Sequence, residues 1–467
     1  MLTLLTIFFL QFTDKVGSER LCLSPTAIEM REQRGIRMDE LDYEVSPLYL
    51  DSIQAMGATV LHTSRWFNGA TVQANDTVIH AIERCGFVDT VFLTKNDPTP
   101  FGKPSVALRK MQVLSNTAPI NTQSVASTEQ LALLNLLPLH QAGYRGKGIR
   151  IGLADGGFYH ADSLEALPRE QWLGIADFTN IEEDIFGATG NHGTLCLTAI
   201  VGSTPEYTGA ATDAEYFLFR TEEPATESPK EIDNWVAAIE MADSLGLHIV
   251  STSLGYTTFD NELFDYTYAD MDGRTSRGAQ AAAIAARKGM LLVIAAGNEG
   301  DKQWHYLSTP SDADSILTVG AVDESGGIAS FSSFGPSADG RVKPEVCAVG
   351  KQTALVNPSN TYVIHSNGTS FACPLIAGMA ACLWSALPDA NNMEIRERII
   401  RSANRYNLPQ EQYGYGIPNA WMAYTMPTNV QSPSTHHLPH ANKVINNGHI
   451  YLLYNNCLYD VLGNKLK

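Results

Sequence analysis

Four polar residues have the side-chain types that nucleophilic catalysis requires: Asp155, His192, Asn298 and Ser370. A serine nucleophile needs a base that takes its proton and a third group that orients the base. Histidine and aspartate can fill these two roles, and a side-chain amide can donate a hydrogen bond to an oxyanion. These residue types permit acyl transfer, and the elements around them decide whether they can meet.

Ser370 lies in the stretch NGTSFACP at residues 367–374, where Gly368 permits a tight turn and an apolar helical pattern continues to about Leu387. A serine at a helix start lies beside unpaired N–H groups and the positive end of the helix dipole, which favour developing negative charge. We expect Pro374 in or near the first turn, where proline removes no intrahelical hydrogen bond. A well-capped structural helix would explain the same stretch.

The other three candidates lie beside predicted strands and helices. Asp155 follows an apolar strand predicted at 149–154, and Asn298 follows a strand predicted at 290–296. His192 comes just before a helix predicted at 195–201. Functional groups of open α/β sheets gather at the carboxyl ends of the strands. Taken singly, each residue also fits a turn or loop position.

Strands alternate with helices through the middle of the chain, which predicts an α/β fold with a largely parallel sheet. Further strands are predicted at 248–253 and 316–322, and helices are predicted at 129–142, 233–245, 274–287 and 393–402.

Composition shifts divide the chain into five parts. Residues 1–98 form a small α+β domain, 99–128 a linker and 129–426 the large α/β domain. A second linker at 427–442 leads to a short β unit at 443–467. The small first domain carries no catalytic constellation of its own.

Charge and cysteine content limit the function further. The net charge of −18 argues against nucleic acid and anionic membrane surfaces as partners. No apolar run approaches the length of a transmembrane helix, and the seven cysteines show no disulfide framework. The apolar residues 1–10 lack a basic region and a cleavage site, so we prefer a first strand at Ile7–Thr13 over a signal peptide.

Three motifs together resemble the subtilisin family of serine endopeptidases (subtilases). They are His-Gly-Thr at 192–194, Ala-Ala-Gly-Asn at 295–298 and Gly-Thr-Ser-Phe-Ala-Cys-Pro at 368–374. Supporting matches are Ser253-Leu254-Gly255 and Phe331-Ser332-Ser333-Phe334-Gly335. The resemblance covers about residues 130–425, and the aspartate–histidine–serine order is that of subtilisin.

The resemblance implies a subtilisin-like parallel sheet flanked by helices and hydrolysis of protein or peptide substrates. Ser370 would attack the scissile carbonyl, His192 would move the proton and Asp155 would orient His192. The Asn298 side chain and the Ser370 backbone N–H would form the oxyanion hole. The strand that pairs with substrate backbone would be Ser253, Leu254 and Gly255. Gly156 departs from the family, which usually has a hydroxyl residue after the aspartate.

The resemblance also gives roles to the flanking parts. Residues 1–98 resemble a subtilase propeptide, an intramolecular inhibitor removed by self-processing between about Lys95 and Thr128. A retained accessory domain is the alternative. The C-terminal tail weakly resembles the end of sorting domains on secreted Bacteroidetes proteins, and a plain accessory hairpin is the alternative. A secreted, cell-surface or periplasmic location is inferred from the family alone.

No cofactor is required by this chemistry. A structural calcium ion at Asp265, Asp270 and Asp272 is an option, although their spacing matches no known ligand loop. The histidines at 436, 437 and 440 fit a solvated linker better than a metal site. A catalytically silent subtilase scaffold is the rival function. An α/β-hydrolase esterase is excluded because Ala372 stands where its nucleophile elbow needs glycine.

Overall fold

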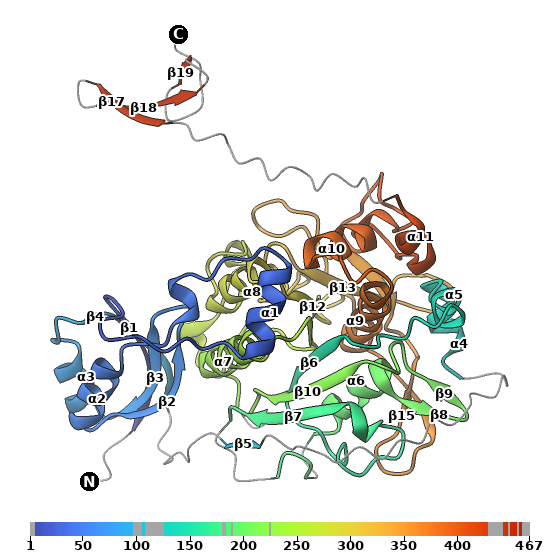
Figure 1. The fold of residues 1–467 in the computed structure, drawn as a ribbon, viewed down its shortest axis with the longest axis horizontal. Coiled ribbons are helices and arrows are strands. Elements are labelled where there is room, and N and C mark those ends of the chain that lie inside the picture. Colours follow the sequence, from blue (N-terminus) through green and yellow to red (C-terminus); the bar gives the residue numbers. More distant parts are fainter. Residues whose placement is uncertain are drawn as a thin grey trace. The chain divides into compact units, whose positions relative to one another are not determined.

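The structure is a computed structural model of the 467-residue chain (Figure 1). It divides into two compact units, Met1–Met426 and Pro427–Lys467. The described residues are 5–96, 105–107, 126–179, 184–187, 190–223, 226–427, 442–446, 449–454 and 457–459.

The N-terminal part is an antiparallel sheet in the order β2-β3-β1-β4. Its strands are β1 (Thr6–Phe12), β2 (Thr59–Ser64), β3 (Gly69–Ala74) and β4 (Val88–Asn96). Apolar side chains of the sheet pack with those of α2 (Pro47–Ala55) and α3 (Asp76–Ile82) in a core of their own. The strand predicted at Ile7–Thr13 is present one residue earlier as β1, with Ile7 and Leu10 fully buried.

Serine–proline pairs start two helices of the N-terminal part. Ser24 caps α1 (Pro25–Gln33) by accepting a hydrogen bond from Ala27 N at 3.2 Å. Ser46 caps α2 in the same way, with Tyr49 N at 3.4 Å. In each helix proline takes the first position, where its missing N–H has no intrahelical acceptor to lose.

The large sheet has eight strands in the order β14-β13-β12-β11-β6-β10-β7-β5. The seven strands from β14 to β7 are parallel, and β5 joins antiparallel to β7. Their bounds are β5 Ser105–Ala107, β6 Arg150–Asp155, β7 Trp172–Asp177, β10 Glu215–Arg220, β11 Ile249–Thr252, β12 Leu291–Ala295, β13 Leu317–Val322 and β14 Val346–Val349. The predicted α/β fold with a parallel sheet flanked by helices is confirmed.

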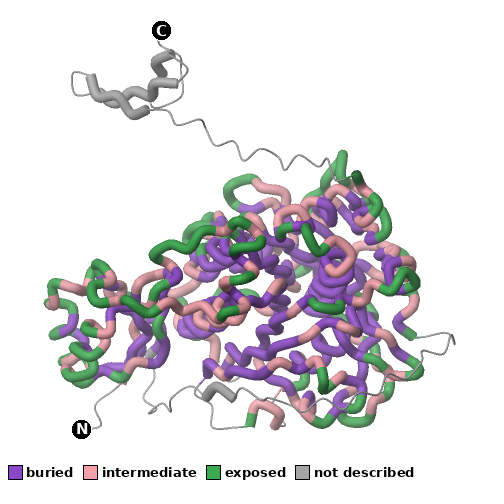
Figure 2. The backbone as a smooth tube through the Cα atoms, in the orientation of Figure 1, coloured by how far each residue is buried: buried purple, intermediate pink, exposed green. Residues whose placement is uncertain are grey.

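Helices cover both faces of this sheet, which is why its strands read as continuous apolar runs. Leu291 and Val293 of β12 face the core that contains α6 (His192–Val201) and α9 (Thr369–Ala386). Leu292 and Ile294 face the opposite core, with α7 (Pro229–Leu245) and α8 (Arg277–Arg287). Buried residues concentrate along the strands and the inner faces of these helices (Figure 2).

The remaining elements lie around these layers. The helices are α4 (Thr128–Leu133), α5 (Leu137–Gln141), α10 (Asn392–Arg401) and α11 (Ala420–Thr425). Two short hairpins pair β8 (Ser203–Thr204) with β9 (Tyr207–Thr208), and β15 (Thr353–Val356) with β16 (Val363–Ser366). In the second unit, β17 (Asn442–Asn446), β18 (His449–Tyr454) and β19 (Cys457–Tyr459) form an antiparallel sheet.

Several predicted elements need correction. The helix predicted at 129–142 is two helices, α4 and α5, because Asn135 between them has a left-handed φ of 49°. α7 starts earlier than predicted, at Pro229, and α8 starts later, at Arg277. The strands β7 and β10 were not predicted, and β5 lies inside the predicted linker at 99–128.

Helix α9 corrects a further prediction, because its length and composition would suffice to cross a membrane. In the structure, however, 89% of its apolar window is buried inside the protein. The helix packs against β11, β12 and β13, so its apolar surface belongs to the core.

Candidate active site

Asp155 and His192 meet at the carboxyl end of β6. Asp155 is the last residue of that strand and is 1% exposed, while His192 is the first residue of α6. Nδ1 of His192 lies 2.9 Å from both carboxylate oxygens of Asp155. The Gly156 N–H donates to Asp155 Oδ1 at 2.8 Å, so backbone supplies a hydrogen bond to the carboxylate there.

A glycine allows α6 to approach Asp155 this closely. A Cβ atom on Gly193 would lie 2.5 Å from the carbonyl oxygen of Gly157 and 2.9 Å from Cβ of Asp155. Any larger residue would therefore push the helix start, and His192 with it, away from the carboxylate.

The carboxylate also sets the charge of the imidazole. Burial alone would lower the pKa of His192, but the charge and hydrogen bond of Asp155, together with the neighbouring Cys196, outweigh burial and raise the pKa well above 6.5. The Asp155 contact fixes Nδ1 as the protonated nitrogen of the neutral ring, which leaves Nε2 as the acceptor.

Ser370 is the second residue of α9, where a backbone N–H has no intrahelical acceptor. Its side chain is nearly buried, and Oγ donates a long hydrogen bond to the Ser253 carbonyl at 3.4 Å. Among the described residues Ser370 Oγ makes no hydrogen bond to His192. The His192 ring does lie close to α9, with its centroid 5.6 Å from that of Phe371.

The prediction for Pro374 is wrong, and the reason bears on Ser370. Because α9 begins at Thr369, Pro374 is its sixth residue, beyond the first turn. Proline there removes the N–H that would bond to the Ser370 carbonyl four residues earlier. That carbonyl instead accepts from Ser253 Oγ at 2.8 Å and from Cys196 Sγ at 3.3 Å. Two other segments thus hold the start of α9.

Asn298 is held by its amide oxygen. Oδ1 accepts the Thr369 N–H at 2.9 Å and the Thr369 hydroxyl at 3.1 Å. A backbone N–H can only donate, so the oxygen must face Thr369 and the amide nitrogen must point elsewhere. Within the described residues Nδ2 of Asn298 has no hydrogen-bond partner, which leaves two N–H groups for a ligand.

Two cavities connect these residues. One of about 500 Å³ is lined by Asp155 and His192, and one of about 320 Å³ is lined by Asn298, Ser370 and the segment Ser253-Leu254-Gly255. Three residues line both cavities: Glu222, Glu227 and Leu254. The structure therefore gathers every predicted site residue around one cleft at the carboxyl ends of β6, β11 and β12.

Sequence reasoning missed several residues of this cleft. Thr369 orients Asn298, and Cys196 bonds to the Ser370 carbonyl. Glu222 and Glu227 come from the loop after the unpredicted strand β10. Thr369 and Cys196 lie inside or beside recognised motifs, so the motifs could have indicated that both residues belong to the site. No such signal marked the two glutamates.

The proposed calcium ligands do not converge on one point. Asp265 accepts a hydrogen bond from Phe259 N, Asp270 from Thr267 and Asp272 from Arg274 and Thr275. Each carboxylate thus closes a turn of its own segment, and calcium binding by this set stays a prediction. The linker histidines at 436, 437 and 440 lie outside the described residues.

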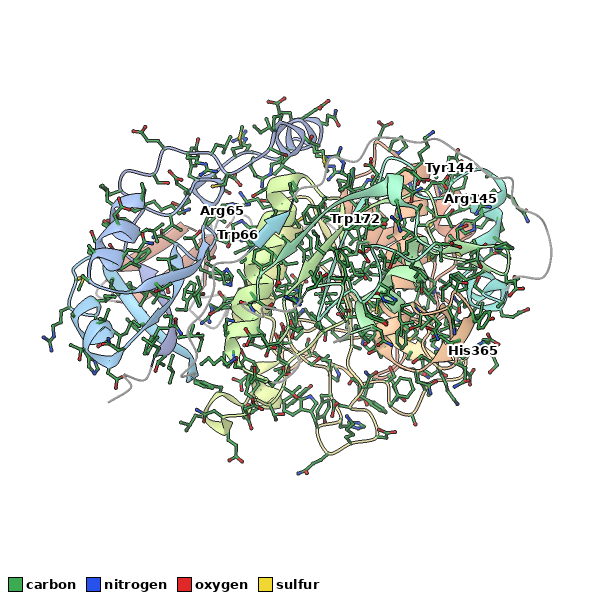
Figure 3. All side chains as sticks on the ribbon, turned by 90° about the horizontal axis from the view of Figure 1, so that it is seen from below. Arg65, Trp66, Tyr144, Arg145, Trp172 and His365 are labelled. Carbon is green, nitrogen blue, oxygen red and sulfur yellow. The ribbon has the colours of Figure 1, made fainter. Side chains whose placement is uncertain are left out.

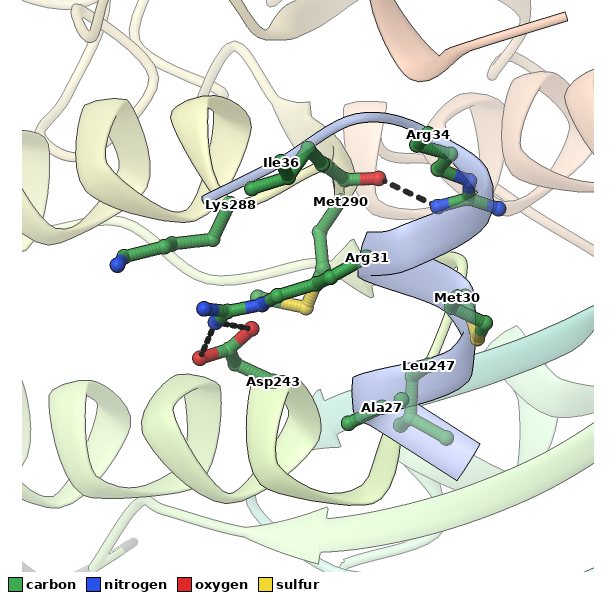
Figure 4. Close-up of a pocket in the computed structure, with 11 residues that line it drawn as sticks. Ala27, Met30, Arg31, Arg34, Ile36, Asp243, Leu247, Lys288 and Met290 are labelled. Carbon is green, nitrogen blue, oxygen red and sulfur yellow. Dashed lines mark hydrogen bonds and ion pairs between the residues drawn. The ribbon is translucent and has the colours of Figure 1, made fainter. Parts of the chain in front are cut away.

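The N-terminal domain packs on α7 through buried charges. Arg31 bonds to both oxygens of Asp243 at 2.7 Å (Figure 4), and Arg65 also reaches Asp243, at 2.5 Å. Glu240 Oε2 accepts Arg65 N at 2.9 Å, and its other oxygen accepts Trp66 N at 3.3 Å. Figure 3 shows Arg65 and Trp66 between the N-terminal sheet and α7.

A buried imidazole also joins the two parts. His62 of β2 lies 2.9 Å from the Asn234 side chain of α7. Burial lowers the pKa of His62 to about 4, so the ring is neutral at physiological pH.

Comparisons with known proteins agree with the fold. The model of the subtilase family, peptidase S8, matches residues 146–416, and that of the Bacteroidota peptidase S8 propeptide domain matches residues 8–106. The chain therefore belongs to the subtilase family of serine peptidases and carries a propeptide domain. The predicted family membership is confirmed.

Individual relatives support the same assignment. The chain is 28% identical over 323 residues to the thermostable alkaline protease of Halalkalibacterium halodurans, which covers 68% of this chain and 80% of that protein. It is 30% identical over 284 residues to subtilisin DY of Bacillus licheniformis, covering 59% and 91% of the two chains. The solved structure of MycP1 from the ESX-1 type VII secretion system shares the fold, with a TM-score of 0.51 and 19% identity over 69% of this chain and 92% of that one.

Proposed function

We propose that the chain is a self-processed precursor of a serine endopeptidase that works through an acyl-enzyme on Ser370. Oγ of Ser370 attacks the scissile carbonyl carbon while His192 Nε2 takes its proton. The carbonyl electron pair moves to the oxygen, which accepts hydrogen bonds from Asn298 Nδ2 and the Ser370 N–H.

The carbon–nitrogen bond then breaks as His192 returns the proton to the leaving amine. Water attacks the ester in the second half, with His192 again as base, and Ser370 is released. Asp155 stabilises the imidazolium in both halves without taking the proton itself.

The observation that carries this proposal is the contact between Asp155 and His192 at the cleft, with Nδ1 2.9 Å from both carboxylate oxygens. The orientation of Asn298 supports the proposal. The Thr369 N–H can only donate, so it must face Oδ1 of Asn298, and the amide nitrogen of Asn298 then points away from Thr369. The long Ser370 Oγ contact is compatible with the role, because such hydrogen bonds often tighten only when substrate binds.

We also propose that residues 1–98 inhibit the enzyme until self-processing between Lys95 and Thr128 releases them. The buried contacts of Arg31 and Arg65 with α7 support an inhibitor that stays bound after cleavage. Family membership supports export to the cell surface, the periplasm or the medium. For the tail at 443–467, we keep both a sorting segment and an accessory hairpin as proposals.

A fluorophosphonate probe tests the central claim, because it forms an adduct only with an activated serine. The processed protein should carry the adduct on Ser370, located by mass spectrometry. Ser370→Ala and His192→Ala should not label, whereas Ser359→Ala, which changes an exposed serine, should label normally. Folded, processed protein without an adduct would establish the silent scaffold in place of the peptidase.

A further inference from the structure

A helical arm of the propeptide domain extends away from its sheet and onto the large domain. The arm is residues 20–44, which contain α1 and lie between β1 and α2. Its two ends meet, because the Cys22 N–H donates to the Asp42 carbonyl at 2.8 Å and the Glu44 N–H donates to the Arg20 carbonyl at 3.0 Å. From this base α1 reaches α7 (Figure 1). Among the described residues, the core of the propeptide domain contains no side chain from the arm.

The arm contacts the turns that precede β11 and β12. Gly246 lies between α7 and β11, and Gly289 lies between α8 and β12. A Cβ atom on Gly246 would lie 3.0 Å from the backbone of Ala27, and one on Gly289 would lie 2.5 Å from Cδ1 of Ile36. Because β11 and β12 are parallel and the cleft lies at their carboxyl ends, the arm binds at the opposite edge of the sheet from Ser370.

Charges alternate across this contact. Arg31 of the arm pairs with Asp243 of α7 at 2.7 Å and with Asp42 of the arm at 2.6 Å. Lys288, at the end of α8, brings Nζ to 3.0 Å from Asp42 and 2.7 Å from Asp39. Each domain thus contributes a cation and a carboxylate to one connected network. An occupant of this surface must bring both signs of charge in the right order, and the arm does so.

Arg34 of the arm has partners of another kind. It donates to the Gly289 carbonyl at 2.9 Å (Figure 4), and its guanidinium carbon lies 4.7 Å from the ring centroid of Trp384. Burial lowers the pKa of Arg34 to about 10, so it stays charged at neutral pH. Within the described residues no carboxylate forms an ion pair with it. The side chain can therefore be removed without leaving a carboxylate unpaired.

We propose that these contacts form a second anchor, separate from the cleft, that determines how long the cleaved propeptide stays on the enzyme. The anchor on the large domain, the arm site, consists of Asp243, Gly246, Lys288, Gly289 and Trp384. The inference rests on the proposed peptidase function and adds a device that delays activation.

Two separate anchors slow release more than either does alone. When the part of the propeptide near the cleft lets go, the arm keeps it at a high local concentration, so it binds again before it can leave. The propeptide is lost only when both contacts are open at once. The arm therefore prolongs inhibition without touching any catalytic residue.

Removing the arm from the full chain tests the anchor. Leu21 and Tyr43 already pair at the base of the arm, so a short glycine linker can join them in place of Cys22–Asp42. We expect self-processing to continue and the cleaved propeptide to dissociate at least about 100-fold faster, the gain that a second binding contact typically gives. Size-exclusion chromatography and the onset of peptide cleavage measure the rate. An unchanged dissociation rate would overturn the proposal.

A single substitution tests the same anchor in a chain that keeps the arm. Arg34→Ala should speed dissociation about tenfold, because it removes a charged hydrogen bond and a cation–π contact. Arg37→Ala, an exposed arginine of the same arm, should leave the rate unchanged. The arm leaves with the propeptide, so the freed enzyme is identical in all these variants and any difference in onset reports release alone. Equal rates for Arg34→Ala and Arg37→Ala would overturn the proposal, even if the chain without the arm did not fold.

Failure of the anchor can be distinguished from failure of the peptidase. If the peptidase proposal fails, the chain does not process itself and the fluorophosphonate probe does not label Ser370. A recognition site for an added protease, placed in the linker predicted at 99–128, would then produce the cleaved complex and allow the same dissociation rates to be measured. If only the anchor proposal fails, Ser370 labels, every variant processes itself, and the propeptide leaves all of them at the same rate.

Discussion

The propeptide interface and the catalytic cleft are both built from buried polar groups, but their atoms are partnered differently. At the interface, every guanidinium nitrogen of Arg65 has an acceptor, on Leu41, Glu240, Ser244 or Asp243. In the cleft, the Asn298 side chain is held at its oxygen only, by Thr369. His192 is held at Nδ1 by Asp155, and its Nε2 has only a long contact with the Cys196 thiol, at 4.0 Å.

This difference in hydrogen-bond partners distinguishes residues that hold the propeptide from residues that can react with a substrate. A polar group whose atoms are all bound within the chain can only contribute to affinity or stability. A group held at one atom is oriented, and its other atom remains available to a substrate. Substitutions at the interface should therefore change binding of the propeptide, whereas substitutions in the cleft should change turnover.

The largest effect on turnover among these variants is expected for Asp155→Asn. The amide presents an N–H where the carboxylate accepts, so the imidazole takes the wrong tautomer and its charged form loses support. We expect kcat to fall by about 10⁴, the size of effect known when this role is removed from serine proteases, including a subtilisin.

The measurement is kcat on one peptide together with thermal unfolding. Asp389→Asn, an exposed aspartate, is the matched control and should change neither. If Asp155→Asn lost less than tenfold in kcat, turnover would not depend on the contact between Asp155 and His192.

Asn298→Ala should have the next largest effect. It removes the donor that points away from Thr369, and the interaction matters chiefly in the transition state. We expect kcat to fall by about 10²–10³ with little change in KM, a magnitude taken from a subtilisin. Steady-state kinetics would test this, with Asn407→Ala, an exposed asparagine, as control. An equal rise in KM with kcat unchanged would assign Asn298 to substrate binding instead.

Arg65→Ala tests the propeptide interface. It leaves Asp243 and Glu240 short of a buried cation partner, which costs about 2–5 kcal/mol in propeptide binding. The propeptide should dissociate at least about 30-fold more readily after self-processing, measured by size-exclusion chromatography and by the onset of activity.

Arg84→Ala, an exposed arginine of the same domain, should not release the propeptide. The kcat of the freed enzyme should be the same for both variants. A lowered kcat for Arg65→Ala would show that the interface also shapes the cleft.

The pH dependence of turnover should reflect the Asp155–His192 contact. Burial opposes the charged ring, but the Asp155 charge raises the pKa of His192 well above 6.5. Only the neutral ring can accept the Ser370 proton, so kcat/KM should rise about tenfold per pH unit below a midpoint above 6.5. Asp155→Asn removes the charge and should move the midpoint to lower pH. A midpoint at or below 6.5 in the unsubstituted enzyme would contradict this electrostatic coupling.

The sequence predicted the parts of this site that depend on short stretches. The end of β6 at Asp155 and the helix start at Ser370 both follow from neighbouring residues. The break at Asn135 could not be predicted, because a left-handed residue inside an apolar pattern leaves the periodicity intact.

Contacts between distant segments were also beyond local patterns. Ser253 and Ser370 are 117 residues apart, and their hydrogen bond exists only because the parallel sheet brings β11 beside α9. The positions of Glu222 and Glu227 depend on β10, whose apolar run was not recognised as a strand. The candidate catalytic residues could therefore be predicted from sequence motifs, whereas the residues that surround them in the fold could not.

Ser253→Ala should have the smallest effect, and it tests a cleft residue whose hydroxyl is fully engaged in holding the start of α9. Its hydroxyl bonds to the Ser370 carbonyl, which Pro374 leaves without an intrahelical donor. Removing that hydroxyl leaves a buried carbonyl with the weaker Cys196 thiol, which should cost about 1–3 kcal/mol of stability. We expect kcat to fall only severalfold, because Ser370 stays on the same helix.

A double-mutant cycle with Pro374→Ala isolates this contact. Alanine restores an N–H that can bond to the Ser370 carbonyl within the helix, so Ser253→Ala should cost clearly less stability in that background. Unfolding free energies of the four proteins, each in the Ser370→Ala form to prevent self-digestion, would give the coupling. Equal costs in both backgrounds would mean that the Ser253 hydroxyl does not compensate for the proline, and that something other than this hydrogen bond holds the start of α9 against β11.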